Sequence, residues 1–153
     1  MAKKPLVKRK LSTKKKLPVH VPLKTIIAAS AALALLEVVL IYFEILPPAL
    51  SYSPGNLLFS LGMLALVAYA GFASAQQGLG KAVLNGAAVS IAASLTLSIS
   101  SIVLKTCGRP ILGISAADQL SVYLLLVLII LENTLLGAII AALAALARRF
   151  TKH

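Results

Sequence analysis

The chain has 153 residues, of which 59% are apolar and only 12% charged, and its mean hydropathy is +0.97. Soluble domains carry about 25% charged residues, so this composition excludes an ordinary soluble domain. The single cysteine, Cys107, excludes an intrachain disulfide and a cysteine-rich metal site, and the two histidines, His20 and His153, lie in the tails. We expect no metal, no cofactor, no catalytic residue and no enzymatic activity.

Residues 1–24 are predicted to form a basic tail that holds nine of the 15 lysines and arginines. Its cations favour three interpretations: a signal that keeps the tail in the cytoplasm, contact with anionic lipid headgroups, or contact with RNA or the ribosome. Nucleic acid is the least favoured partner, because the tail has no aromatic residue and one arginine. The cations assigned to headgroups are Lys8, Arg9, Lys10, Lys14, Lys15 and Lys16.

The first predicted membrane span covers residues 25–46 and contains two carboxylates and no cation. As a helix it would be roughly 33 Å long, enough to cross a hydrocarbon core of about 30 Å. Glu37 and Glu44 are seven residues apart, which predicts that both lie on one face of this helix. Pro47 and Pro48 end it, because proline cannot continue a helix.

The second and third spans are predicted over residues 57–75 and 82–104. Both are rich in small residues, which let membrane helices approach closely and predict a tight bundle. One stripe on the third span repeats every four residues and has two interpretations. Helix packing is favoured, and a polar lining that faces Glu37 or Glu132 is the alternative. The stripe consists of Gly86, Ser90, Ser94 and Ser98.

The fourth span is predicted over residues 122–146, after a loop from 105 to 121. Ser115 and Asp118 match a capping box, which predicts a helix start at Ser115. Glu132 stands near the middle of the span and Asn133 follows it. Residues 150–153 form a short basic end after the transmembrane domain, which we place over residues 25–149.

The distribution of cations predicts the topology. With both termini in the cytoplasm, the cytoplasmic segments hold 13 of the 15 lysines and arginines, and the outer loop holds only Lys105 and Arg109. Cytoplasmic segments are enriched in lysine and arginine, and an even number of spans returns the chain to its starting side. The predicted fold is all-α: an up-and-down bundle of four transmembrane helices, integral to the cell membrane.

Four polar side chains form the candidate intramembrane site: Glu37, Glu44, Glu132 and Asn133. Counted along the spans, Glu37 and Glu132 are both expected near the membrane midplane, and Glu44 near the outer interface. A carboxylate at that depth is expensive and marks a candidate functional site. Each acid could be protonated and donate a hydrogen bond, the two could share a proton, or they could bind a proton or cation in turn.

Three functions are consistent with these features. The leading hypothesis is a non-enzymatic accessory or scaffold subunit that packs against another membrane protein. The alternative is a small proton- or cation-coupled transporter or channel, which works as a homo-oligomer through Glu37 and Glu132. The weakest is a membrane anchor for nucleic acid or ribosomes. The anionic lipid bilayer is the partner common to all three.

Overall fold

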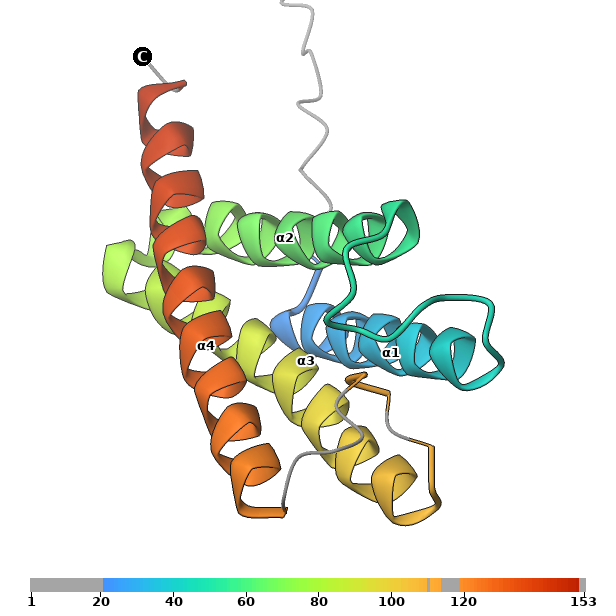
Figure 1. The fold of residues 1–153 in the computed structure, drawn as a ribbon. Helices are drawn as coiled ribbons and strands as arrows, with labels where there is room; N and C mark the ends of the chain where they lie inside the picture. The colour runs from blue at the N-terminus through green and yellow to red at the C-terminus, as the bar shows by residue number, and fades with distance from the viewer. Residues whose placement is uncertain (1–20, 110, 114–118, 152–153) are drawn as a thin grey trace, which may run out of the picture.

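The computed structural model describes residues 21–109, 111–113 and 119–151, and within these residues the secondary structure is helical. Figure 1 shows four long helices: α1 (Leu23–Tyr42), α2 (Pro54–Ser74), α3 (Leu79–Thr106) and α4 (Gln119–Phe150). A short 3-10 helix, η1 (Ala75–Gln77), follows α2. The headgroup cations predicted in the basic tail lie outside the described residues.

All four long helices are long and apolar enough to cross a membrane. Large apolar side chains cover the outside of the bundle: Leu58 is 69% exposed, Leu128 58% and Leu131 62%. Such an apolar surface is suited to lipid. The predicted fold is confirmed: the chain is an all-α integral membrane protein with a four-helix bundle.

The first helix ends four residues earlier than predicted, at Tyr42. Glu44 takes a left-handed backbone conformation with φ 61°, and the N–H of Ile45 turns back to the carbonyl of Leu40 at 2.9 Å. This geometry is a common way to satisfy the last carbonyls of a helix. The prediction that Glu44 shares a helical face with Glu37 is therefore wrong, because Glu44 lies beyond the helix.

Helices α2 and α3 each begin three residues before the predicted spans. At the start of α2, the Ser53 hydroxyl accepts the N–H of Asn56 at 3.1 Å and Pro54 occupies the first turn. Ser53 therefore caps α2, and proline tolerates the first turn because its missing N–H would be unpaired anyway. Helix α3 follows Gly78, whose φ of 111° makes the sharp turn after η1. The predicted capping box from Ser115 to Asp118 lies outside the described residues.

Helix α3 is the centre of the bundle and packs against each of the other three helices. The closest crossings join glycines to α4. A Cβ on Gly86 would stand 2.6 Å from the carbonyl oxygen of Gly137, and one on Gly71 would stand 2.7 Å from the carbonyl carbon of Ala141. Small residues thus let the α2–α4 and α3–α4 backbones meet directly.

The bundle is open where α1 faces α4. Over the described residues, no Cα atom of α1 lies within 8 Å of one in α4. Figure 1 shows α2 and α4 crossing near the end of α2 and diverging from there. The expectation of tight packing throughout the bundle does not hold in this region, since the glycine crossings lie on one side of it.

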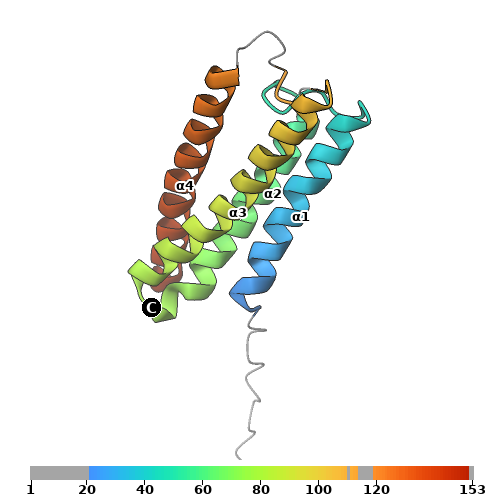
Figure 2. The same ribbon diagram turned by 90° about the horizontal axis from the view of Figure 1, so that it is seen from below.

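The helices alternate in direction, as Figure 2 shows. The start of α1, η1 and the end of α4 lie at one end of the bundle, which we call the turn end. The connections 43–53 and 107–113 lie at the other, which we call the loop end. Four alternating helices place the first and last described helix ends on the same side, as the up-and-down prediction requires.

Candidate functional site

A cavity of about 560 Å³, which we call the central cavity, lies among all four helices. Ligand cavities in proteins typically measure about 300–1,000 Å³ and combine apolar walls with a few convergent polar groups. The walls here are mostly apolar and carry six side chains with polar atoms: Glu37 from α1, Ser60 from α2, Ser90 and Ser94 from α3, and Glu132 and Asn133 from α4.

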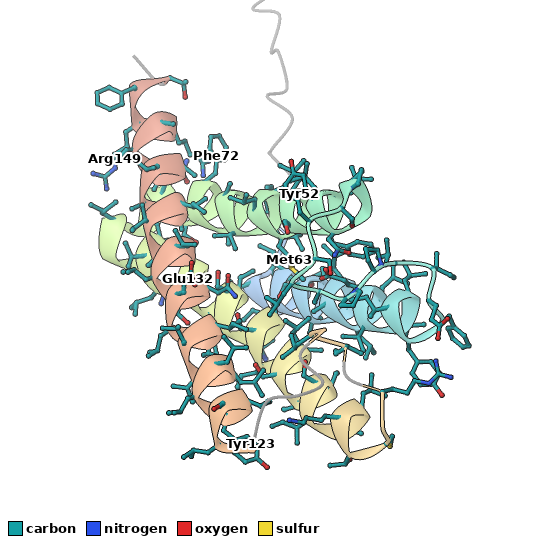
Figure 3. The ribbon with its side chains drawn as sticks, viewed as in Figure 1. Tyr52, Met63, Phe72, Tyr123, Glu132 and Arg149 are labelled. Carbon is teal, nitrogen blue, oxygen red and sulfur yellow. The ribbon has the colours of Figure 1, made fainter. Side chains whose placement is uncertain are left out.

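The two central acids line this one cavity although they are far apart in sequence. Glu37 is half-buried, whereas Glu132 and its neighbour Asn133 are exposed as well as lining the cavity, so the cavity opens to the surface along α4. Among the described residues, neither carboxylate has a hydrogen-bond or ion-pair partner. Figure 3 shows Glu132 on α4 and Met63 on α2, which lie on facing walls.

Glu37 lies nearer to the loop end than predicted. The early end of α1 leaves Glu37 five residues before Tyr42, which is about 7.5 Å along the helix axis. The connection after α1 reaches the same depth, because Ala49 and Leu50 also line the central cavity. The central cavity therefore extends from the middle of the bundle to the connection at the loop end.

The serine stripe on α3 divides between the two roles considered for it. Gly86 lies against Gly137 and Ala141 of α4. Ser90 and Ser94 line the central cavity, and the Ser94 hydroxyl donates to the Ser90 carbonyl at 2.8 Å. The Ser98 hydroxyl is buried and has no partner among the described residues. Serine can bond to the carbonyl four residues earlier, as Ser94 does, without help from another helix.

Two cavity residues on α2, Ser60 and Met63, were not among the predicted site residues. They share one helical face with Leu64 and Val67, at spacings of three, four and seven residues. The signal was present but weak, because α2 carries no charge and every side of it is apolar or small. The sequence pattern alone could not show which side faces the acids.

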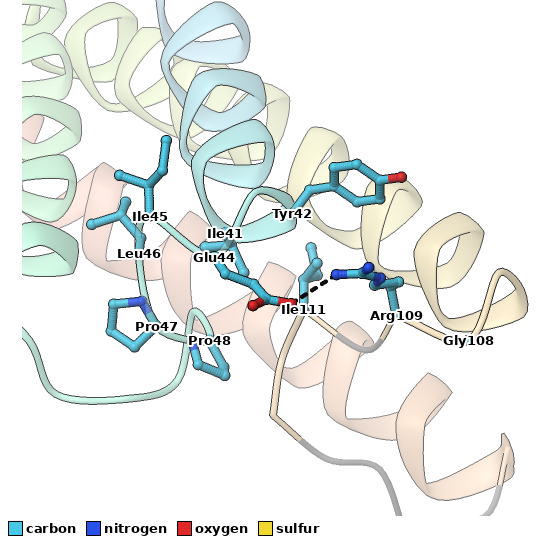
Figure 4. A pocket seen from close by; sticks show the side chains of 10 residues that line it. All are labelled: Ile41, Tyr42, Glu44, Ile45, Leu46, Pro47, Pro48, Gly108, Arg109 and Ile111. Atoms are coloured by element: carbon cyan, nitrogen blue, oxygen red, sulfur yellow. Dashed lines mark hydrogen bonds and ion pairs between the residues drawn. The ribbon is translucent and has the colours of Figure 1, made fainter.

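Glu44 stands apart from the central cavity, at the loop end. Its carboxylate accepts a hydrogen bond from Arg109 at 2.8 Å, which pairs the two connections (Figure 4). The Arg109 guanidinium also lies over the ring of Tyr42, 5.6 Å from its centroid. A second hollow of about 500 Å³ lies beside this pair, bounded by Pro47, Pro48 and Ile111 among others. Glu44 is thus separate from the pair formed by Glu37 and Glu132.

Backbone and amide hydrogen bonds hold the connection that borders the central cavity. The Ala49 N–H donates to the Ile111 carbonyl at 2.8 Å, which ties the two connections together. The Asn56 side chain, only 6% exposed, donates to the carbonyls of Pro48 at 3.0 Å and Ser51 at 2.9 Å. These bonds fix Ala49 and Leu50 at the cavity wall.

Polar contacts also join the helices at the turn end. Arg148 of α4 donates to the carbonyl of Phe72 at 2.5 Å and lies over its ring, 4.8 Å from the centroid. Nearby, the Asn85 amide of α3 donates to the Ser74 hydroxyl of α2 at 2.5 Å. These contacts hold α2, α3 and α4 together at the end where their small residues meet.

Comparison with protein-family models, with curated proteins and with solved structures finds no match to this chain. The class of the protein therefore follows from its fold alone. It is a small integral membrane protein with four helices suited to spanning a bilayer.

Proposed function

We propose that the protein is a small transporter or channel that binds a proton or cation at Glu37 and Glu132. The observation that carries this proposal is the central cavity, because it brings both acids to one space lined by four helices. A four-helix chain with closed packing would leave little room for a pathway. The divergence of α4 from α2 provides that room.

The lack of internal partners for these acids supports a cationic occupant. Among the described residues neither carboxylate is paired, and the described cations lie near the helix ends: Lys24, Lys81, Lys105, Arg109, Arg148 and Arg149. Acids within membrane helices usually face a cavity and mark ion or proton pathways. A proton or a bound cation would neutralise the carboxylates of Glu37 and Glu132, which have no cationic partner among the described residues.

The described helix ends support an orientation with the turn end in the cytoplasm. Four of the described cations lie at the turn end, and two, Lys105 and Arg109, lie at the loop end. Tyr42, Tyr52 and Tyr123 also gather toward the loop end, where amphipathic rings favour the membrane interface. We propose the cell membrane as the location, with the basic tail on anionic headgroups of the cytoplasmic leaflet.

Flux through purified protein tests the proposal. The protein is reconstituted into liposomes, and proton and sodium fluxes are measured for the native chain, Glu37→Gln and Glu132→Gln. Glu44→Gln is the matched control, because it removes the same charge outside the central cavity. We expect flux above that of empty liposomes, lost in the two cavity variants and kept in the control. Flux equal to empty liposomes, or equal in all variants, would refute the proposal.

A second function, an accessory subunit, is favoured by the exposure of Glu132 and Asn133 along α4. A cation on a neighbouring transmembrane helix could reach Glu132 from outside the bundle. Purification in mild detergent separates this function from the first. A stoichiometric partner that is lost with Glu132→Gln and kept with Glu44→Gln would support the subunit, and a chain that purifies alone would contradict it.

A further inference from the structure

The walls of the central cavity indicate which class of cation it holds. We infer that the occupant is an organic amine with an apolar body, whose ammonium group donates hydrogen bonds to Glu37 and Glu132. This inference rests on the proposed function and names the substrate class of the same site. Three observations support this inference: the cavity walls are mostly apolar around two acids, the hydroxyl of Ser90 has no partner among the described residues, and no described lining residue is aromatic.

The excess of apolar over polar surface on the cavity walls disfavours a bare metal ion as the occupant. Calcium takes 6–8 oxygen ligands at 2.3–2.6 Å and magnesium requires near-ideal octahedral geometry. Among the described residues, no three acidic, histidine or cysteine side chains come together in a group that could hold a metal. Most of the surface of this cavity of about 560 Å³ is instead apolar, from residues such as Met63, Leu97 and Ile140. Apolar walls around two carboxylates match an amine that carries a hydrocarbon body.

Ser90 provides an independent sign of a polar occupant. Its side chain is only 8% exposed and lies on the cavity wall, yet its hydroxyl has no hydrogen-bond partner among the described residues. The hydroxyl is not among the fully buried polar atoms that lack a partner, so it is open to the cavity and can form a hydrogen bond with an occupant. The Asn133 side chain faces the same space and adds an amide oxygen that can accept a hydrogen bond. A primary ammonium has three N–H donors, so one remains for Ser90 or Asn133 after Glu37 and Glu132 are bonded.

The lining residues also predict which amines bind. None of the described residues that line the central cavity is aromatic. Sites for quaternary ammonium groups use aromatic rings around the cation, whereas a primary ammonium is held by charge-assisted hydrogen bonds to carboxylates. The site should therefore prefer an amine with N–H donors to its fully methylated analogue.

Calorimetric titration of the full-length protein in nanodiscs tests the inference, with empty nanodiscs as the blank. The probe is hexylamine, compared with hexyltrimethylammonium, hexanol and sodium ion. We expect saturable binding of hexylamine, and binding about tenfold or more weaker for the methylated cation and the alcohol, because each loses charge-assisted hydrogen bonds. Equal binding of hexylamine and hexyltrimethylammonium, or binding of sodium ion alone, would overturn the inference.

Variants connect the binding to the central cavity. Glu37→Gln and Glu132→Gln should each weaken hexylamine binding about tenfold or more, and Glu44→Gln should leave it unchanged. Ser90→Ala keeps both acids and should weaken binding by about two- to tenfold. Equal weakening by Glu44→Gln would overturn the inference. So would full binding by Glu37→Gln and Glu132→Gln, provided that both elute as single species on size exclusion.

The inference and the proposed function can fail separately. Flux of protons or sodium that depends on Glu37 and Glu132, without hexylamine binding, would overturn the amine as substrate and leave the transport function standing. Hexylamine binding that depends on these acids, without flux of protons, sodium or the amine, would uphold the site and remove the transport function.

Discussion

Gly86 of α3 and Gly137 of α4 meet backbone to backbone: the Gly137 carbonyl oxygen lies 2.6 Å from where a Cβ of residue 86 would stand. Gly71 of α2 approaches Ala141 of α4 in the same way. Both crossings lie in the half of the bundle toward the turn end. Helix α4 is therefore anchored at one end and diverges toward the other, and the central cavity lies in the space this leaves.

The glycine crossing should not accept a side chain. We expect Gly86→Leu to lower the free energy of unfolding by about 1–3 kcal/mol or more, because overpacking a tight contact forces the backbones apart. Thermal unfolding in detergent measures the effect. Gly80→Leu is the control, since a Cβ at Gly80 on the same helix would meet nothing within 4 Å. An equal loss of stability in both variants would contradict the proposed cause.

The Asn56 amide should be important for stability despite its position next to a loop. Asn56→Leu removes the two hydrogen bonds that this buried amide donates to the carbonyls of Pro48 and Ser51, and it should cost about 1–3 kcal/mol. Tyr52→Leu, four residues away and 95% exposed, should change stability by less than about 0.5 kcal/mol. Melting temperatures of the two variants, measured in one detergent, decide this, and similar values would refute the prediction.

The Glu44–Arg109 ion pair should contribute little to stability. Its side chains are 80% and 55% exposed, so solvent screens their attraction. A double-mutant cycle with Glu44→Ala and Arg109→Ala should give a coupling energy below about 1 kcal/mol. A much larger coupling would mean that the pair, and not the Asn56 and Ala49 hydrogen bonds, holds the loop end together.

Filling the central cavity should block it without removing a charge. Met63→Trp replaces a flexible side chain on the wall opposite Glu132 with a larger indole ring. We expect this change to weaken hexylamine binding about tenfold and to reduce flux to a similar extent. Leu58→Trp is the matched control on the same helix, because Leu58 is 69% exposed on the outer surface. Normal flux in the Met63 variant would place the pathway elsewhere.

Cysteine labelling should verify the topology. The single cysteine, Cys107, is exposed at the loop end. A membrane-impermeant maleimide added to intact cells should label it, because the distribution of cations predicts an external loop end. In Cys107→Ser, a new cysteine at Thr151 should react only after the cells are permeabilised. Labelling of both positions in intact cells would contradict the even number of spans.

The sequence by itself determined the class of the protein and the existence of its helices. Long stretches with few or no charges, the first of them ended by Pro47 and Pro48, predict four spans, because the bilayer requires continuous apolar helices of this length. The cap at Ser53 and Pro54 likewise depends on a few neighbouring residues. Signals of this kind are local, so they can be found without knowing how the helices pack.

Only the tertiary structure decided which residues share a space. The left-handed turn at Glu44 separates it from Glu37, and the pairing with Arg109 depends on a connection 65 residues away in the chain. The rotation of each helix was equally hidden from the sequence. Helices that are apolar on every side have no periodic pattern to orient them, and backbone contacts such as those of Gly86 and Gly137 set the rotation instead. Together with the packing of α1 on α2 and α3, those contacts place Glu37, Glu132 and Met63 around one cavity.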